Sequence, residues 1–197
     1  MKKGCLGIAV VVIIVLVITG FWGISKYNGF ISLQEGVNSQ WANVENVYQR
    51  RADLIPNLVN TVKGYATHEE KTLTEVVEAR AKATQTTIDP TKLTDENIAA
   101  FQKAQDGLSG ALSRLMVSVE QYPDLKANQN FLDLQSQLEG TENRIAVERR
   151  TFNEKAQAFN TAIRIFPANI IAGIGGFQQK GYFKAAEGSD IAPVVNF

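Results

Sequence analysis

The chain has 197 residues, enough for one membrane anchor and one folded domain of roughly 140 residues. Its 20 Lys and Arg balance its 20 Asp and Glu without a basic block, which excludes the electrostatic footprint of a nucleic-acid-binding protein. With one Cys and one His, the chain cannot form an internal disulfide or supply the ligands of a usual zinc site, although composition alone leaves carboxylate metal sites open.

An uncharged stretch from Gly4 to Ser25 follows two lysines at the N-terminus. A run of this length crosses the ~30 Å hydrocarbon layer of a bilayer as a helix. Phe21 and Trp22 fall at its far end, where aromatic side chains favour the headgroup region. A cleaved signal peptide is the competing interpretation, but the residues after the apolar run form a poor cleavage site. We therefore predict a retained transmembrane helix and a short linker over residues 1–30. The lipid bilayer is then one binding partner of the protein.

The charges that flank this helix bear on its orientation. Lys2 and Lys3 place the N-terminus in the cytoplasm by the positive-inside rule, and the folded domain on the outer side. Lys26, Arg50 and Arg51 lie beyond the helix and weaken this bias. The expected topology is a single pass with the N-terminus inside, and the reverse orientation stays open.

Residues 31–167 predict an all-helical domain, because long stretches lack Pro and no stretch shows sustained alternation of apolar and polar residues. Near its end, six large apolar residues recur every seven positions, which predicts one long helix that begins at an Asn128 N-cap and ends at Pro167. These six residues are Phe131, Leu138, Ile145, Phe152, Phe159 and Phe166.

A second heptad pattern precedes this helix in the chain. It places Phe101, Leu108, Leu115 and Tyr122 on one stripe. Thr94 followed by two acids suits a helix N-terminus, since a hydroxyl caps free N–H groups and the acids lie at the positive end of the dipole. The pattern predicts a helix that begins at Thr94 and ends before Pro123.

An apolar stripe from about Ser32 to Val62 predicts the first helix of the domain. Pro56 lies within it and removes a backbone hydrogen bond, so we expect a kink there. Gly64 suits a helix C-terminus, and Thr67 with Glu70 has the pattern of a capping box, which predicts a break at residues 64–67 and a short following helix. One unbroken helix to about residue 83 is the alternative.

The choice between these two interpretations decides where the C-terminal segment lies. Four antiparallel helices return the chain to the membrane side, whereas three leave it at the distal tip. Residues 168–197 form a Gly-rich apolar tail that is better placed against lipid or a neighbouring subunit than in water. This favours an N-terminal transmembrane helix followed by an antiparallel, up-and-down four-helix bundle with long helices.

Several irregular strings resemble the LemA family of bacterial membrane-anchored proteins, and the resemblance extends from the anchor to about Phe183. The strings are RRADLIPNLV at 50–59, VKGYATHE at 62–69, EQYPDLKA at 120–127 and LEGTENRI at 138–145, with Phe-Asn pairs at 152–153 and 159–160. The resemblance implies a four-helix, up-and-down domain tethered to the bacterial cytoplasmic membrane. It implies no known reaction.

Three charged residues fall on the apolar seams of the predicted helices. Arg51 lies on the seam of the first helix, and Glu142 and Arg149 lie four residues beyond Leu138 and Ile145 on the last. A buried charge is costly unless it is matched. We therefore predict that Arg51 pairs with Glu142 across the bundle and that this polar seam has a structural role.

The residues predict no catalytic centre, no cofactor and no metal site. His68 lies beside two glutamates at a helix start, and no second His or Glu-x-x-His pair exists to build a metal site within a helical bundle. The carboxylates lack an associated nucleophile or a Gly-rich phosphate loop. We therefore expect a protein without enzyme activity of its own.

Two functional classes remain. The first is a membrane-tethered scaffold of the bacterial cell envelope that forms homo-oligomers or docks other envelope proteins. The second is an accessory or regulatory subunit of a membrane enzyme such as a quality-control protease. A large homo-oligomer without other polypeptides would support the first class, and a monomer recovered with an enzyme would support the second.

Overall fold

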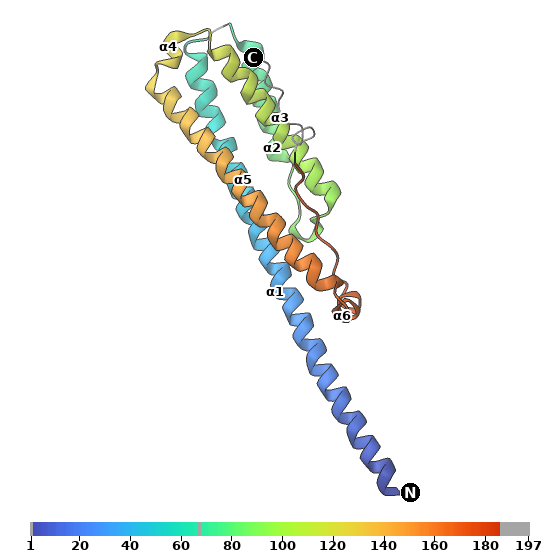
Figure 1. Ribbon diagram of the computed structural model, residues 1–197. Helices are drawn as coiled ribbons and strands as arrows, with labels where there is room; N and C mark the ends of the chain where they lie inside the picture. Colours follow the sequence, from blue (N-terminus) through green and yellow to red (C-terminus); the bar gives the residue numbers. More distant parts are fainter. Residues whose placement is uncertain (1, 67, 186–197) are drawn as a thin grey trace, which may run out of the picture.

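The computed structural model describes the backbone of residues 2–66 and 68–185, and the side chains of residues 7–8, 10–66 and 68–185. Over these residues the chain forms helices joined by connecting segments and contains no strand, which confirms the all-α prediction. Figure 1 shows an elongated molecule in which one long helix extends well beyond the packed helices at its N-terminal end.

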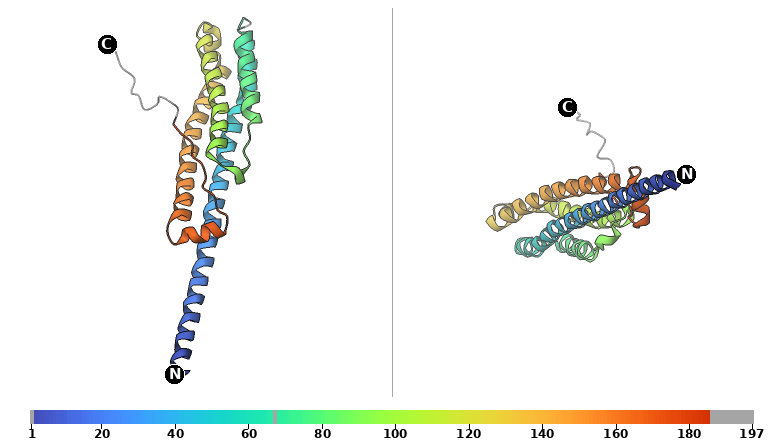
Figure 2. Two further views of the ribbon diagram at one scale, coloured as in Figure 1. Left: turned by 90° about the vertical axis from the view of Figure 1, so that its right-hand side faces the viewer. Right: turned by 90° about the horizontal axis from the view of Figure 1, so that it is seen from below.

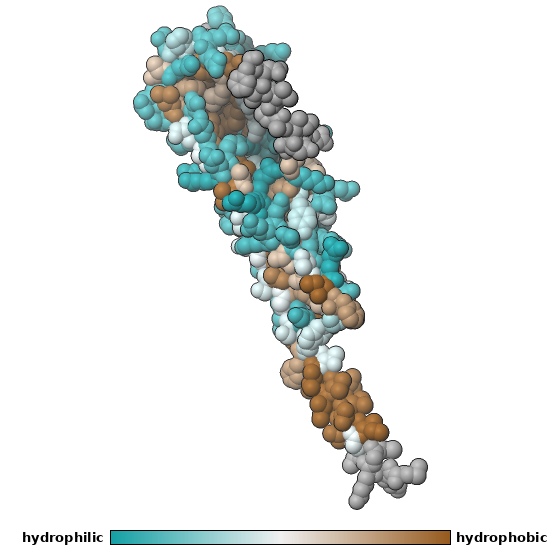
Figure 3. Space-filling model, viewed as in Figure 1, coloured by the Kyte–Doolittle hydropathy of each residue, from teal (hydrophilic) through white to brown (hydrophobic). Residues whose placement is uncertain are grey.

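The longest element, α1 (Lys2–Lys63), is one helix of 62 residues and is about 93 Å long at 1.5 Å per residue. Its N-terminal part is long and apolar enough to cross a membrane, and none of that stretch is buried. Figure 3 shows it as a continuous hydrophobic surface below the packed helices. Trp22 is partly buried against the packed helices, and Phe30, at 2% exposed, is the first fully buried side chain among the described residues of α1. The helix is therefore a candidate membrane span over its first part and a packing element over the rest.

The other helices form the body of the molecule. They are α2 (Glu70–Gln85), the 3-10 helix η1 (Pro90–Lys92), α3 (Asp95–Val119), α4 (Pro123–Lys126), α5 (Gln129–Arg164) and α6 (Ala168–Ile174). α1 packs against α5, and α2 packs against both α3 and α1, with chain directions that alternate along the long axis (Figures 1 and 2). The main helices are unequal, because α2 has 16 residues and α5 has 36. The short helix α4 lies at the distal end and α6 at the end near the exposed span.

The chain breaks between α1 and α2, which decides against one unbroken helix to residue 83. The N–H groups of Tyr65 and Ala66 both donate to the Val62 carbonyl and close the end of α1. The N-cap of α2 is Glu69, and its side chain makes no capping hydrogen bond. The predicted cap residue, Thr67, lies outside the described residues.

The predicted N-caps of the other two long helices are confirmed. The Thr94 hydroxyl accepts from the Asn97 N–H at 3.3 Å, and the Asn128 side chain accepts from the Phe131 N–H at 3.1 Å. α3 ends at Val119, and Pro123 then starts α4. The helix ends therefore follow from local side-chain chemistry, as the sequence indicated.

The heptad stripe of α5 is buried along most of its length. Phe131, Leu138, Ile145, Phe152 and Phe159 are all 7% exposed or less. Phe166, the sixth member of the pattern, is 77% exposed. α5 ends at Arg164, two residues earlier, so the helical register no longer directs that side chain to the core.

The C-terminal segment turns back along the helices after α6. Two asparagines of α5, seven residues apart, hold its backbone. The Asn160 side chain accepts from the Lys180 N–H at 2.8 Å and donates to the Lys180 carbonyl at 2.7 Å, and Asn153 does the same with Phe183, at 2.9 Å each. Phe183 is 5% exposed. Residues 168–185, which the sequence assigned to an apolar tail, are therefore part of the packed structure, and residues 186–197 of that tail lie outside the described residues.

Gly181 brings this returning segment into close contact with the start of α3. Its N–H donates to the Leu93 carbonyl at 2.8 Å, and a Cβ on Gly181 would lie 2.5 Å from the Asp95 backbone nitrogen. Backbone atoms cannot move aside as a flexible side chain can, so a side chain here must displace one of the two segments.

We expect Gly181→Ala to lower the free energy of unfolding by about 2 kcal/mol, since it overpacks this contact. Gly140, in the middle of α5, is the matched control, because a Cβ there has no neighbour within 4 Å. Gly140→Ala should raise stability by about 0.5–1 kcal/mol through helix propensity. Guanidinium unfolding of the full chain in detergent, followed by circular dichroism, measures both. Equal effects of the two variants would contradict the close contact.

Candidate functional site

A layer of polar side chains divides the core into two apolar clusters. It consists of Arg51 from α1, Gln105 from α3 and Glu142 from α5. Each of the three lies between two apolar neighbours on its own helix that belong to different clusters. The neighbours nearer the span are Tyr48, Phe101 and Ile145, and the neighbours nearer the distal end are Ile55, Leu108 and Leu138. The layer therefore crosses the whole core at one level.

Arg51 lies at the centre of this layer and is 1% exposed. Its Nη1 donates to a carboxylate oxygen of Glu142 and to the Ser109 hydroxyl at 2.9 Å. Its Nη2 donates to the side-chain oxygen of Gln105 at 2.8 Å. The guanidinium carbon lies 5.2 Å from the centre of the Tyr48 ring. Of the three guanidinium nitrogens of Arg51, only Nε is buried without a hydrogen-bond partner among the described residues, so the buried charge is largely matched.

The Glu142 side chain is 49% exposed, so the ion pair joins a buried cation to a carboxylate that reaches solvent. The structure thus brings Arg51 and Glu142 together. Such a pairing is costly to break, because the remaining charge stays buried. We interpret the layer as a device that sets the axial register of α1, α3 and α5, since polar residues at heptad seam positions act in this way.

The third residue of the predicted polar seam, Arg149, does not join this layer. Its Nη2 donates to the Lys184 carbonyl at 2.9 Å, and its guanidinium carbon lies 4.9 Å from the centre of the Phe183 ring. Arg149 therefore contacts the returning C-terminal segment, which occupies the seam at this level.

Pro56 lies inside α1, and the helix continues through it. A proline has no N–H for the carbonyl four residues earlier, which here is that of Ala52. Arg80 of α2 takes that carbonyl, and its Nε donates to it at 2.7 Å. Pro56 thus frees a carbonyl of α1 that accepts a hydrogen bond from α2. The predicted kink at Pro56 stays a prediction.

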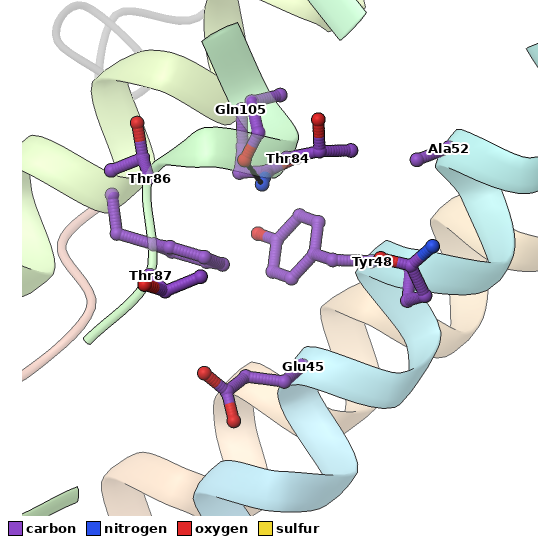
Figure 4. A pocket seen from close by; sticks show the side chains of 10 residues that line it. Glu45, Tyr48, Ala52, Thr84, Thr86, Thr87 and Gln105 are labelled. Atoms are coloured by element: carbon purple, nitrogen blue, oxygen red, sulfur yellow. Dashed lines mark hydrogen bonds between the residues drawn. The ribbon is translucent and has the colours of Figure 1, made fainter. Parts of the chain in front are cut away.

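A small pocket opens beside the polar layer, between α1, α2 and α3 (Figure 4). The Tyr48 ring points into it, Glu45 lies on one side, and Thr84, Thr87 and Gln105 lie opposite. Its volume is about 70 Å³. Pockets for drug-sized ligands measure about 300–1,000 Å³, whereas this one has room for a few water molecules. The pocket is therefore too small for a drug-sized ligand.

Burial changes the acid–base properties of two groups in this pocket. Burial raises the pKa of the Glu45 carboxyl, and it also raises the pKa of the Tyr48 phenol against the lowering effect of Arg149 and Arg51. Elsewhere, burial lowers the pKa of Lys180, whose ammonium group donates to the Pro90 carbonyl at 3.2 Å. A raised Tyr pKa leaves the phenol protonated at neutral pH, so this group is not prepared to act as a base.

The described residues form no group of three or more His, Cys, Asp or Glu side chains that could hold a metal ion. The side chain of His68 is exposed in the turn just before α2. Within this part of the chain, the side chains of the polar layer bond to one another, to the Ser109 hydroxyl and to the Ala83 carbonyl.

Sequence reasoning missed Gln105, Ser109 and Arg80. Gln105 follows Phe101 by four residues, as Leu112 follows Leu108, so its place on the α3 seam was visible in the sequence. Arg80 gave no such signal, because its role depends on where α2 packs against α1.

Comparison with known proteins relates this chain to characterised sequences. The profile of the LemA family matches residues 40–197. Magnetosome protein MamQ of Magnetospirillum gryphiswaldense is 29% identical over 187 residues, which cover 86% of this chain and 68% of that protein. Magnetosome protein MamQ 2 of Paramagnetospirillum magneticum is 29% identical over 95% of this chain and 75% of its own length. Protein LemA of Metamycoplasma hominis is 25% identical over 83% of this chain and 71% of its own length. The chain belongs to the LemA family.

Proposed function

We propose that this protein is a membrane-tethered helical scaffold of the bacterial cell envelope, which associates with further copies of itself and has no catalysis of its own. The observation that carries the proposal is that two exposed apolar surfaces lie at opposite ends of the elongated molecule. The exposed apolar part of α1 lies at one end, and an open apolar groove lies at the other, where α1 meets α2. The bacterial relatives, a magnetosome protein and a LemA protein, support a membrane-associated helical protein.

The distal groove has a volume of about 520 Å³. Its lining residues are Val59, Lys63, Ala66, Glu70, Leu73, Thr74, Val77 and Glu78. Among these residues Val77 is 49% exposed, whereas Leu73 is 7% exposed. An open apolar groove bordered by charged side chains is typical of a surface that binds another protein.

A second copy of this chain is the occupant that we propose for the groove. Lys63 lies on its α1 side and Glu70 and Glu78 lie on its α2 side. In a twofold arrangement the same patch faces itself, so Lys63 of each copy meets the acids of the other. A membrane anchor also keeps the copies in one plane, which raises their effective concentration.

Val77→Glu tests this proposal without entering the core. We expect the full chain to form cross-linked dimers or larger species in membranes, and Val77→Glu to reduce their yield about tenfold, because a buried unpaired carboxylate opposes the interface. Val117→Glu is the matched control, since Val117 is 67% exposed on α3 and lies away from the groove.

Cross-linking in intact membranes, followed by mass spectrometry of every band, measures this effect. A monomer at all expression levels would overturn the proposal, and so would equal yields for the two variants. Recovery of a membrane enzyme as the main cross-linked species would favour an accessory subunit instead. Labelling of single cysteines on either side of the membrane tests the expected topology, in which the N-terminus lies in the cytoplasm.

A further inference from the structure

Four large apolar side chains are exposed around α6 at the base of the packed helices. Ile165 is 56% exposed, Phe166 77%, Ile170 55% and Ile174 81%. Phe166, Ile170 and Ile174 follow one another at intervals of four residues, which places the two isoleucines on one face of α6 and Phe166 just before it. The opposite face of α6 is buried through Ala168 and Ala172. α6 thus has an inner face against the protein and an outer apolar face.

Contacts between α6 and α1 show at which level of the candidate span α6 lies. A Cβ on Gly23 would lie 3.4 Å from the Ile171 side chain, and the Tyr27 ring lies 5.4 Å from the Phe177 ring just after α6. Gly23 falls in the last turn of the uncharged stretch that ends at Ser25, and Lys26 is the first charge beyond it. α6 therefore lies beside α1 at the level where the candidate span leaves the hydrocarbon layer.

The direction of α6 fits a surface parallel to the membrane. Figure 2 shows α6 across the lower end of the packed helices, crosswise to α1 and α5. When α1 crosses a bilayer along its normal, a helix crosswise to it lies in the membrane plane. The outer face of α6 is then continuous with the lipid-facing surface of α1.

The charge of this region also fits a lipid surface. No Asp or Glu occurs between Glu154 and Glu187, and basic side chains flank the level of α6 at Arg164 and at Lys26 of α1. Arg164 is exposed at the end of α5, immediately before the apolar residues. Basic residues beside an apolar face bind anionic lipid headgroups, and acids in their place would be repelled by them.

We propose that α6 is a second membrane contact, in which Phe166, Ile170 and Ile174 enter the interfacial layer of the same bilayer that α1 crosses. The inference rests on the proposed membrane anchoring of α1. The two contacts together hold the packed helices upright, because a single helical span leaves its tilt free and a second contact beside it does not. The distal groove is then held about 50 Å from the membrane, the length of α5 at 1.5 Å per residue.

Depth-dependent quenching tests the proposal in the full chain. In a Cys5→Ser background, the polarity-sensitive fluorophore NBD is attached through Ile174→Cys, and the protein is placed in phosphatidylcholine and phosphatidylglycerol vesicles. We expect lipids brominated near the top of the acyl chain to lower its emission about twofold, because interfacial helices bury their apolar face about 5–10 Å deep. Phe166→Cys should respond in the same way. Val117→Cys, on the exposed distal part of α3, should not.

A label at Ile14→Cys, near the middle of the candidate span, tests the membrane insertion of α1 separately from the α6 contact. If this label is quenched by deeply brominated lipids and the Ile174 label by neither lipid, the span stands and the α6 contact is overturned. If the Ile14 label is also unquenched, the anchoring of α1 fails with it. Measurement over a range of lipid-to-protein ratios distinguishes lipid from a second copy as the cover of α6. Quenching of the Ile174 label should not depend on this ratio, whereas quenching that is absent at low ratios and appears only on dilution of the protein would overturn the lipid contact in favour of a second copy.

Discussion

Phe183→Ala is expected to lower the free energy of unfolding by about 4 kcal/mol, the typical cost of truncating a buried phenylalanine. The Phe183 ring is stacked on Trp41, with centroids 5.9 Å apart and an interplanar angle of 15°, and meets the edge of Phe152 at 5.5 Å. Trp41 is fully buried and also contacts Phe101. Loss of one ring leaves a cavity within an aromatic cluster that joins α1, α3 and α5, and helices cannot easily collapse to fill it.

Lys184→Ala is the matched control for this effect. Its side chain is exposed, and only its backbone carbonyl accepts hydrogen bonds, from Gln102 and Arg149. We expect a change within about 0.5 kcal/mol, as for other surface substitutions. Guanidinium unfolding of the full chain in detergent, followed by tryptophan fluorescence, gives both values. A Phe183→Ala variant as stable as the control would mean that residues 175–185 do not pack against the helices in solution.

Glu142→Ala should lower the free energy of unfolding by about 3 kcal/mol, at the low end of the range for breaking a buried ion pair. The loss arises from Arg51, which stays 1% exposed with one acceptor fewer. Because the Glu142 side chain is 49% exposed, water can replace part of the lost interaction, which keeps the effect from being larger. Glu142→Gln keeps an acceptor and loses the charge, so its effect should be about half as large.

Glu139→Ala controls for the loss of an exposed glutamate from the same helix. Glu139 accepts only a surface hydrogen bond from Gln135, at 3.1 Å, and its removal should change stability by less than about 0.5 kcal/mol. Thermal and denaturant unfolding, together with the cross-linked oligomer distribution, measure both variants. If Glu142→Gln altered neither the melting temperature nor the oligomer distribution, the prediction that the Arg51 layer has a structural role would be wrong.

A heptad pattern predicts only part of the polar layer. Arg51 and Glu142 could be selected from the sequence because each breaks an apolar stripe at a seam position, and a buried charge needs a partner. The partnership with Gln105 and Ser109 could not be derived in the same way, since it depends on the rotation of α3 against α1. Arg149 breaks the same stripe as Glu142, yet its partner is a backbone carbonyl of the C-terminal segment.

The break between α1 and α2 was favoured from the sequence through Gly64, and the capped ends at Thr94 and Asn128 were read from it correctly. Helix ends of this kind depend on the chemistry of a few neighbouring residues, which the sequence contains. Only part of the role of Pro56 could be predicted from the sequence. A freed carbonyl follows from the absence of an N–H group, but its capture by Arg80 required α2 to lie alongside.

The all-α class, the apolar N-terminal span and the heptad faces of α3 and α5 followed from the order of residues alone, because hydrophobic periodicity is a local property of the chain. The position of the C-terminal segment was decided only by tertiary packing. Its apolar and glycine-rich residues suggested a tail, whereas the amides of Asn153 and Asn160 hold its backbone and Phe183 completes the aromatic cluster around Trp41. These contacts join residues twenty or more positions apart in the chain, and no local pattern encodes which helix faces will receive them.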